Sequence, residues 1–125
     1  MAAKPRPVHL DLTKIRQPIP AIVSILHRAS GVLLFITLPV LLGLLAASLD
    51  RESVFESYLS FISHPIVKLG LIGLLWAFLH HAFAGTRFLF LDAHKGLELQ
   101  TARLTAKIVL ACSLTLTAVI GALLW

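Results

Sequence analysis

The sequence predicts an all-α integral membrane protein with three transmembrane helices. Of its 125 residues, 58% are hydrophobic and 14% are charged, and the mean hydropathy is +0.89. A water-soluble domain of this length could not bury so much apolar surface. Most of that surface comes from three stretches without a charged residue, 29–49, 69–86 and 108–125. Each has about the length that crosses a bilayer core, and none alternates as a barrel strand would.

The basic residues predict the orientation of the chain in the membrane. Five of the eleven Lys and Arg residues precede or open the first span, and four lie between or at the ends of the second and third spans. Only Arg51 and Lys68 occupy the remaining connection. Because short basic flanks stay in the cytoplasm, we expect a cytoplasmic amino terminus, a periplasmic carboxyl terminus and a place in a bacterial cell inner membrane. The net charge of +5 then mostly reflects the basic residues that fix the orientation of the spans in the membrane. No nucleic-acid partner is expected.

Residues 1–125 are expected to form a single membrane-anchor domain. Pro18 and Pro20 favour an extended approach to the first helix, and Pro39 is expected to kink it. Ser53 and Glu56 resemble a capping box that opens a short helix on the outer surface. We expect a cytoplasmic segment at 1–19, a first helix at 20–49 and a short outer interfacial helix at 53–63. The second and third helices are expected at 65–91 and 101–125.

One face of the second helix carries a histidine among small residues. Gly73, Ala77, His81 and Gly85 recur every four residues and so form one stripe. A flat macrocycle can approach a helix only where side chains are small, so the stripe fits the wall of a haem pocket with His81 as axial ligand. Alternatively, His81 hydrogen-bonds across a tight helix interface. His80 points about 100° away from His81, so a second iron ligand would come from elsewhere.

Polar residues also gather at the inner end of the first helix. Ser24, His27, Arg28 and Gly31 are three or four residues apart and share much of one face. A guanidinium and an imidazole there would suit haem propionates, whereas Ser24 and Arg28 would suit the carbonyl oxygens of a quinone. A third interpretation is that Arg28 extends to lipid phosphate and Ser24 bonds its own helix. The residues alone leave all three open.

Two motifs in register resemble the larger cytochrome b membrane subunit of bacterial succinate dehydrogenase, also called respiratory complex II. The motifs are Arg6-Pro-Val-His-Leu-Asp-Leu with Pro18-Ile-Pro-Ala-Ile-Val-Ser-Ile-Leu-His-Arg-Ala-Ser-Gly31, and His81-Ala-Phe-Ala-Gly85-Thr-Arg87 ending near Asp92. The similarity in length, span order and motif spacing covers nearly the whole chain.

The resemblance implies that His81 binds the iron of a single haem b. A smaller membrane-anchor subunit would supply the second ligand and pack with this chain into a helical bundle. The resemblance also implies that His27 and Arg28 lie near the haem propionates, and that Ser24, Ile25 and Arg28 line a ubiquinone site. The chain would anchor a flavoprotein subunit and an iron-sulfur subunit in the membrane lipid, and it would carry no succinate active site itself.

Three further positions bear on this interpretation. The family often has histidine directly after the arginine of the second motif, where this chain has Phe88, so a further imidazole contact to the haem edge is in doubt. Asp92 matches an acidic position at the inner end of the helix and is either a proton carrier or an ordinary helix-end carboxylate. Cys112 is the only cysteine, so this chain cannot by itself build an iron-sulfur cluster.

Three alternative functions fit parts of the pattern. An anchor of a fumarate reductase would serve the reverse reaction, and a haem-free structural anchor would use the small residues for packing alone. A small proton or ion conductor would use His27, Arg28, His80 and His81 as a relay. The two matched motifs favour the succinate dehydrogenase subunit over all three.

Overall fold

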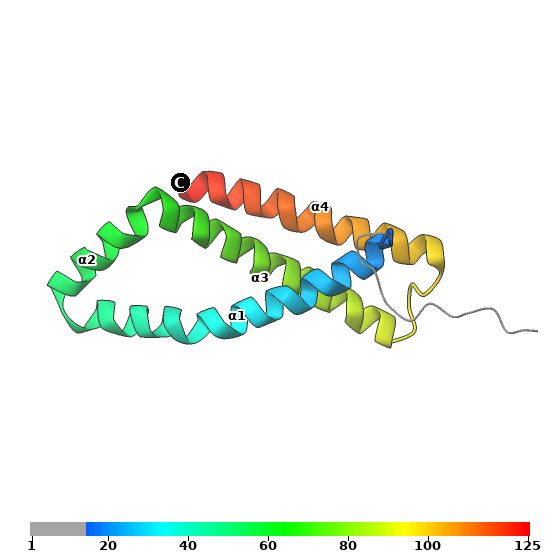
Figure 1. The fold of residues 1–125 in the computed structure, drawn as a ribbon, viewed down its shortest axis with the longest axis horizontal. Coiled ribbons are helices and arrows are strands. Elements are labelled where there is room, and N and C mark those ends of the chain that lie inside the picture. The colour runs from blue at the N-terminus through cyan, green and yellow to red at the C-terminus, as the bar shows by residue number, and fades with distance from the viewer. Residues whose placement is uncertain (1–14) are drawn as a thin grey trace, which may run out of the picture.

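The computed structural model describes residues 15–125, which form four helices (Figure 1). The helices are α1 (Ile19–Asp50), α2 (Glu52–Ser63), α3 (Pro65–Asp92) and α4 (Leu99–Leu124). This part of the chain contains no strand, and α1, α3 and α4 are each long and apolar enough to span a membrane. The predicted all-α fold with three membrane spans is therefore confirmed. The motif at residues 6–12, with most of the expected cytoplasmic segment, lies outside the described residues.

Prolines mark the start of two of the spans. Pro18 is the N-cap of α1 and has an extended backbone, and Pro20 lies in the first turn of that helix. His64 is the N-cap of α3, where its Nδ1 accepts a hydrogen bond from the backbone N–H of Ile66 at 3.3 Å, and Pro65 follows it. At α3 the extended residue His64 directly precedes a proline, as the proline ring favours. In α1 the residue before Pro20, Ile19, is already helical, and Pro20 occupies a first-turn position that proline tolerates.

The longest helix, α1, bends part-way along its length (Figure 1). Pro39 lies inside α1, where it lacks an N–H for the helical ladder and its ring crowds the preceding turn. With 32 residues, α1 extends over about 48 Å at 1.5 Å per residue. A hydrocarbon core of about 30 Å cannot contain that length, so the ends of α1 reach the headgroup regions.

The outer helix α2 has a different start from the one predicted. Its N-cap is Arg51, which makes no side-chain capping bond, so the capping-box interpretation of Ser53 and Glu56 is wrong. Arg51 alone separates α1 from α2, and Ser53 is therefore already helical, whereas an N-cap residue needs non-helical backbone angles. The carbonyl oxygen of Ser53 instead accepts the Ser57 hydroxyl at 3.0 Å.

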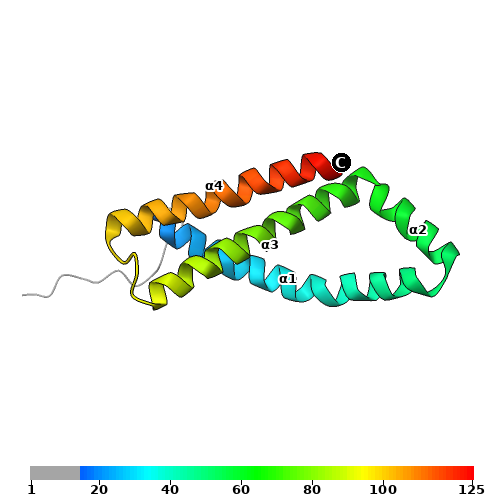
Figure 2. The same cartoon turned by 180° about the vertical axis from the view of Figure 1, so that it is seen from behind.

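Helix α3 is the centre of the bundle and packs against both α1 and α4. Figures 1 and 2 show α1 and α3 crossing and then diverging toward α2, which connects their outer ends, while α4 runs along α3. The buried apolar core contains Val23 of α1, Ala84 of α3, and Ala106 and Val109 of α4. The core lies in the inner half of the bundle because all three spans meet there.

Large apolar side chains cover much of the outside. Phe35 and Leu49 of α1 are 81% and 76% exposed, and similar residues occur along the other spans. Such a surface would be unfavourable in water but suits lipid tails or a neighbouring membrane helix. The bundle is therefore built for an apolar surrounding.

Candidate functional site

His81 lies where α3 crosses α1, against the inner half of α1. Its ring is stacked on the ring of His27, with centroids 4.2 Å apart and an interplanar angle of 13°. The Nδ1 atom of His81 is 3.1 Å from the carbonyl oxygen of His27 and 3.3 Å from Oγ of Ser30. The structure thus brings His81 of the second motif against the end of the first motif.

The hydrogen bonds around His81 assign its tautomer. A carbonyl oxygen can only accept a hydrogen bond, so Nδ1 of His81 carries the proton that it donates to His27. The Ser30 hydroxyl donates its own hydrogen to the same carbonyl at 2.9 Å, so its oxygen can only accept from Nδ1. In the neutral imidazole Nε2 then has the lone pair, and it forms no hydrogen bond within residues 15–125. Metal-binding histidines commonly have this arrangement, with one nitrogen fixed by a carbonyl and the other available.

Two glycines permit the close approach of α1 and α3. A Cβ atom on Gly31 would lie 2.9 Å from Cε1 and 3.3 Å from Nδ1 of His81, so a larger residue there must displace the imidazole. A Cβ atom on Gly85 would lie 3.4 Å from Nε2 of His27. Small residues of this kind let helix backbones approach closely in membranes. Gly31 and Gly85 therefore set the space in which the two histidine rings stack.

The stripe of small residues on α3 has two parts with different surroundings. Toward the inner end, Ala77 is buried and Gly85 packs on His27, as in a tight helix interface. Toward the outer end, Gly73 lines an apolar cleft of about 490 Å³ between α1 and α3. Among residues 15–125, no atom other than the adjoining backbone of α3 lies within 4 Å of a Cβ built on Gly73. The inner part of the stripe therefore has the surroundings of a tight helix interface. The outer part has open space beside it, as the wall of a pocket would.

The residues expected to contact a quinone form no hydrogen bond with His81 within residues 15–125. Ile25 and Arg28 are exposed, and Ser24 is half-buried. Within the described range, neither the Ser24 hydroxyl nor the Arg28 guanidinium has a hydrogen-bond partner or an ion pair. They lie about one helical turn apart on α1, next to His27. Their donors are thus available to a group that this part of the chain does not supply.

His80 has a quite different environment from its neighbour. It is fully buried, and its ring is stacked on Trp76 with centroids 5.3 Å apart. Neither ring nitrogen of His80, nor Nε1 of Trp76, has a hydrogen-bond partner among the residues that the structure describes. His80 therefore belongs to the helix packing and not to the group formed by His27, Ser30 and His81.

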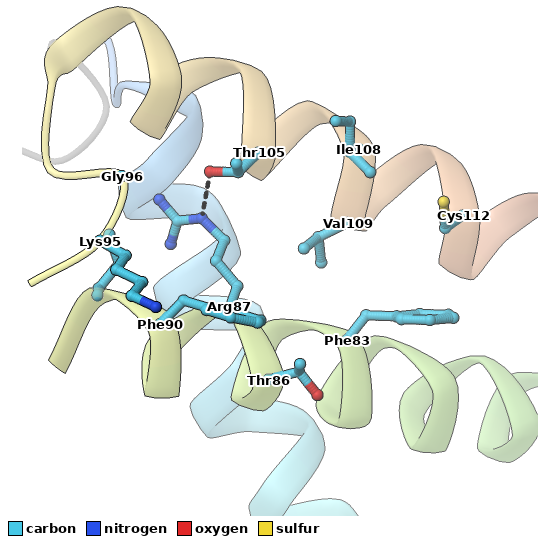
Figure 3. A pocket seen from close by; sticks show the side chains of 11 residues that line it. Phe83, Thr86, Arg87, Phe90, Lys95, Gly96, Thr105, Ile108, Val109 and Cys112 are labelled. Atoms are coloured by element: carbon cyan, nitrogen blue, oxygen red, sulfur yellow. Dashed lines mark hydrogen bonds between the residues drawn. The ribbon is translucent and has the colours of Figure 1, made fainter. Parts of the chain in front are cut away.

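Phe88 connects the histidine pair with a buried arginine. Its ring lies 5.2 Å from that of His27 at an angle of 59°, and the Arg87 guanidinium carbon lies 5.6 Å from the Phe88 ring centroid. Arg87 is 7% exposed, and its Nε donates to Thr105 Oγ1 at 3.1 Å (Figure 3). Its Nη2 donates to the Ala102 carbonyl oxygen, also at 3.1 Å. Phe88 thus packs against His27 and offers no ring nitrogen of its own.

The sequence did not predict the contacts of Ser30 and Thr105, and it left the role of Asp92 open. Ser30 follows His27 by three residues, a spacing that lets a hydroxyl reach the carbonyl one turn back, so the pattern contained a clue. Thr105 holds Arg87 from another helix, and no local pattern indicates that contact. Asp92 is the last residue of α3 and is exposed, which suits both interpretations of its carboxylate.

A comparison with known families agrees with the three-span architecture. The family described as succinate dehydrogenase/fumarate reductase transmembrane subunit matches residues 2–120. The chain belongs to this family. As a member of a transmembrane family with three spans of membrane length, it is a multi-pass protein of the bacterial inner membrane.

Relatives of the chain align with most of its length. The succinate dehydrogenase cytochrome b556 subunit of Coxiella burnetii is 36% identical over 121 residues, which are 96% of this chain and 97% of that protein. The corresponding subunit of Rickettsia felis is 33% identical over 114 residues, or 91% and 87% of the two chains. That of Paracoccus denitrificans is 32% identical over 118 residues, or 89% and 85%. A membrane-anchor role in an oxidoreductase complex of this kind fits the chain.

Proposed function

We propose that this chain is the haem b membrane-anchor subunit of succinate dehydrogenase. It helps form the ubiquinone-reduction site and holds a flavoprotein and an iron-sulfur subunit at the membrane, together with a smaller membrane-anchor subunit. The main support is the hydrogen bond from His81 Nδ1 to the His27 carbonyl, because it leaves Nε2 available as an iron ligand. The relatives' names as cytochrome b556 subunits support the same conclusion.

The residues near His81 suit a haem b. His81 would hold its iron through Nε2, because the hydrogen bond to the His27 carbonyl occupies Nδ1. His27 and Arg28 would neutralise the propionates, and the smaller membrane subunit would supply the second axial ligand. When bound, haem b would supply a one-electron redox centre within the membrane.

Ser24, Ile25 and Arg28 would form this chain's part of the ubiquinone site. The Ser24 hydroxyl and the Arg28 guanidinium would donate hydrogen bonds to a quinone carbonyl oxygen, and these bonds strengthen as reduction places negative charge on that oxygen. Exposed Ile25 would offer an apolar contact to the quinone ring. Because these residues lie at the predicted cytoplasmic end of α1, the two protons of quinone reduction would come from that side.

One experiment tests the assembly and the haem together. The chain would be purified from its native membrane in mild detergent, its associated subunits identified by mass spectrometry, and a dithionite-reduced minus oxidised spectrum recorded. We expect a flavoprotein, an iron-sulfur subunit, a smaller membrane subunit and a b-type absorption band. Copurification of the subunits without a b-type band would favour the haem-free anchor, and transport activity in vesicles without other subunits would favour a conductor.

The family description also names fumarate reductase, so the direction of the reaction needs its own test. The purified complex would be assayed for succinate oxidation with ubiquinone and for fumarate reduction with a reduced low-potential quinone. We expect the first activity to exceed the second. The opposite order would identify the chain as the anchor of a fumarate reductase.

A further inference from the structure

A groove of about 360 Å³ lies between α3 and α4 at their inner ends, away from the His81 contact with α1 (Figure 3). Apolar side chains form most of its walls, including Phe83 and Phe90 of α3 and Ile108 of α4. Arg87 and Lys95 line its inner end, and Cys112 lies at the end toward the middle of α4 (Figure 3). The groove is therefore cationic near the headgroup level and apolar toward the bilayer interior.

Arg87 gives the groove a buried positive charge. A guanidinium has five N–H donors, and Arg87 uses two of them with Thr105 and Ala102. Within residues 15–125 the ion pair found is that of Arg51 with Asp50, so this part of the chain supplies no carboxylate to Arg87. A charge that is 7% exposed at membrane depth is unfavourable without an anion near it. The remaining donors of Arg87 therefore suit an anionic group from outside residues 15–125.

The end of α3 places a second cation at the same groove. The backbone N–H of Lys95 bonds to the Phe90 carbonyl at 2.9 Å and that of His94 bonds to Leu91 at 2.9 Å. With His94 in the left-handed conformation at φ 59°, these bonds form a Schellman motif, which turns the chain back over the last turn of the helix. The motif brings Lys95 to the groove lining beside Phe90 (Figure 3). The position of the cation thus follows from the helix-ending motif.

We propose that this groove binds an anionic phospholipid of the inner leaflet. The phosphate would lie at Arg87 and Lys95, and an acyl chain would extend between Phe83 and Ile108 toward Cys112. A phospholipid has the same order of charge and apolarity along its length as the groove lining, and basic residues at a membrane surface attract anionic headgroups. This binding site is separate from the proposed haem and quinone sites, because none of Ser24, His27, Arg28 and His81 lines it.

Lipid retention by the purified assembly tests this proposal. The assembly would be exchanged into detergent containing equal amounts of phosphatidylglycerol and phosphatidylcholine, and retained lipid would be counted by native mass spectrometry. We expect phosphatidylglycerol to be retained preferentially by the unaltered assembly. Lys95→Ala should lower that preference about fivefold, the effect of one cation near an anionic surface. Lys107→Ala removes an exposed cation of α4 outside the groove and should leave the preference unchanged.

Arg87→Gln should remove the preference more completely, but it also removes bonds between α3 and α4, so Lys95→Ala is the deciding variant. Equal retention of phosphatidylglycerol by the unaltered and Lys95→Ala assemblies would overturn the proposal. Loss of another membrane subunit from the Lys95→Ala assembly, without a change in lipid retention, would also overturn it and would identify the groove as a protein interface. The haem spectrum should be the same in both assemblies, which keeps this test independent of the proposed function.

Discussion

Gly31 of α1 faces the His81 imidazole so closely that a Cβ atom on Gly31 would lie 2.9 Å from Cε1 of His81. A side chain at residue 31 would have to displace the ring, because a contact of 2.9 Å is closer than real Cβ atoms approach. The position of His81 therefore depends on the absence of a side chain at residue 31 as well as on the hydrogen bond to His27.

Gly31→Ala is predicted to displace the His81 ring and to lower the amount of b-type haem in the purified assembly. Overpacking of this kind costs about 1 to 3 kcal/mol of stability. Gly43→Ala is the matched control, because it lies in the same helix with nothing within 4 Å of an added Cβ. That change should preserve the haem band and raise helix stability by about 0.5 to 1 kcal/mol. Spectra and thermal unfolding of both variants check the prediction, and indistinguishable behaviour would refute it.

Ser30→Ala is predicted to change the haem spectrum through loss of the Ser30 contact to His81 Nδ1. Ser48→Ala serves as its control, since Ser48 is also buried in α1 and also donates to the carbonyl three residues back, at 2.7 Å. Each variant should lose about 1 kcal/mol of stability from its bond to the carbonyl three residues back. Only Ser30→Ala should shift the redox potential or the band position of the b-type haem. An equal effect of both on the spectrum would mean that Ser30 has a purely structural role.

His80→Phe is predicted to leave the protein equally stable or to stabilise it by about 1 to 3 kcal/mol. The change keeps a ring against Trp76 and removes two buried nitrogens that lack hydrogen-bond partners within the described residues. Thermal unfolding of the purified assembly measures the effect. A strongly destabilised variant would show that His80 has a polar partner outside this part of the chain.

Ser24→Ala and Arg28→Leu are predicted to lower succinate-dependent ubiquinone reduction by at least tenfold, the effect of losing about 1.4 kcal/mol or more of transition-state stabilisation. Succinate oxidation with an artificial dye should change little, because that activity bypasses the quinone. Arg103→Leu removes an exposed cation from α4 and should leave both activities unchanged. If both activities fell together in the Ser24 and Arg28 variants, the defect would lie in assembly.

The parts of the fold that follow from continuous local patterns were predictable from the sequence. Uncharged runs of membrane length predicted α1, α3 and α4, and Pro18 and Pro65 lie at helix starts because proline acts on its immediate neighbours. The start of α2 was not predictable in the same way. Ser53 and Glu56 have the spacing of a capping box, but α1 continues to Asp50 and leaves Arg51 alone as the connecting residue. Two adjoining helices thus overrode a local capping preference.

The candidate site was predictable only where its residues share a helix face. The spacing of His27 and Gly31, and of His81 and Gly85, placed each pair on one face. The stacking of His27 on His81, the tautomer of His81, and the Arg87 bonds to α4 depend on how the helices cross. Helical periodicity within one segment contains no information about the rotation of a second helix against it, so those contacts required the structure.

The most direct measurement for the central claim is the dithionite-reduced minus oxidised spectrum of assemblies that carry either His81→Ala or His80→Ala. The two residues are neighbours in α3, so both changes remove an imidazole from the same turn of the same helix. We predict that His81→Ala weakens or abolishes the b-type band while His80→Ala keeps a near-normal one. An unchanged band in the His81→Ala assembly would contradict the assignment of His81 as the haem ligand.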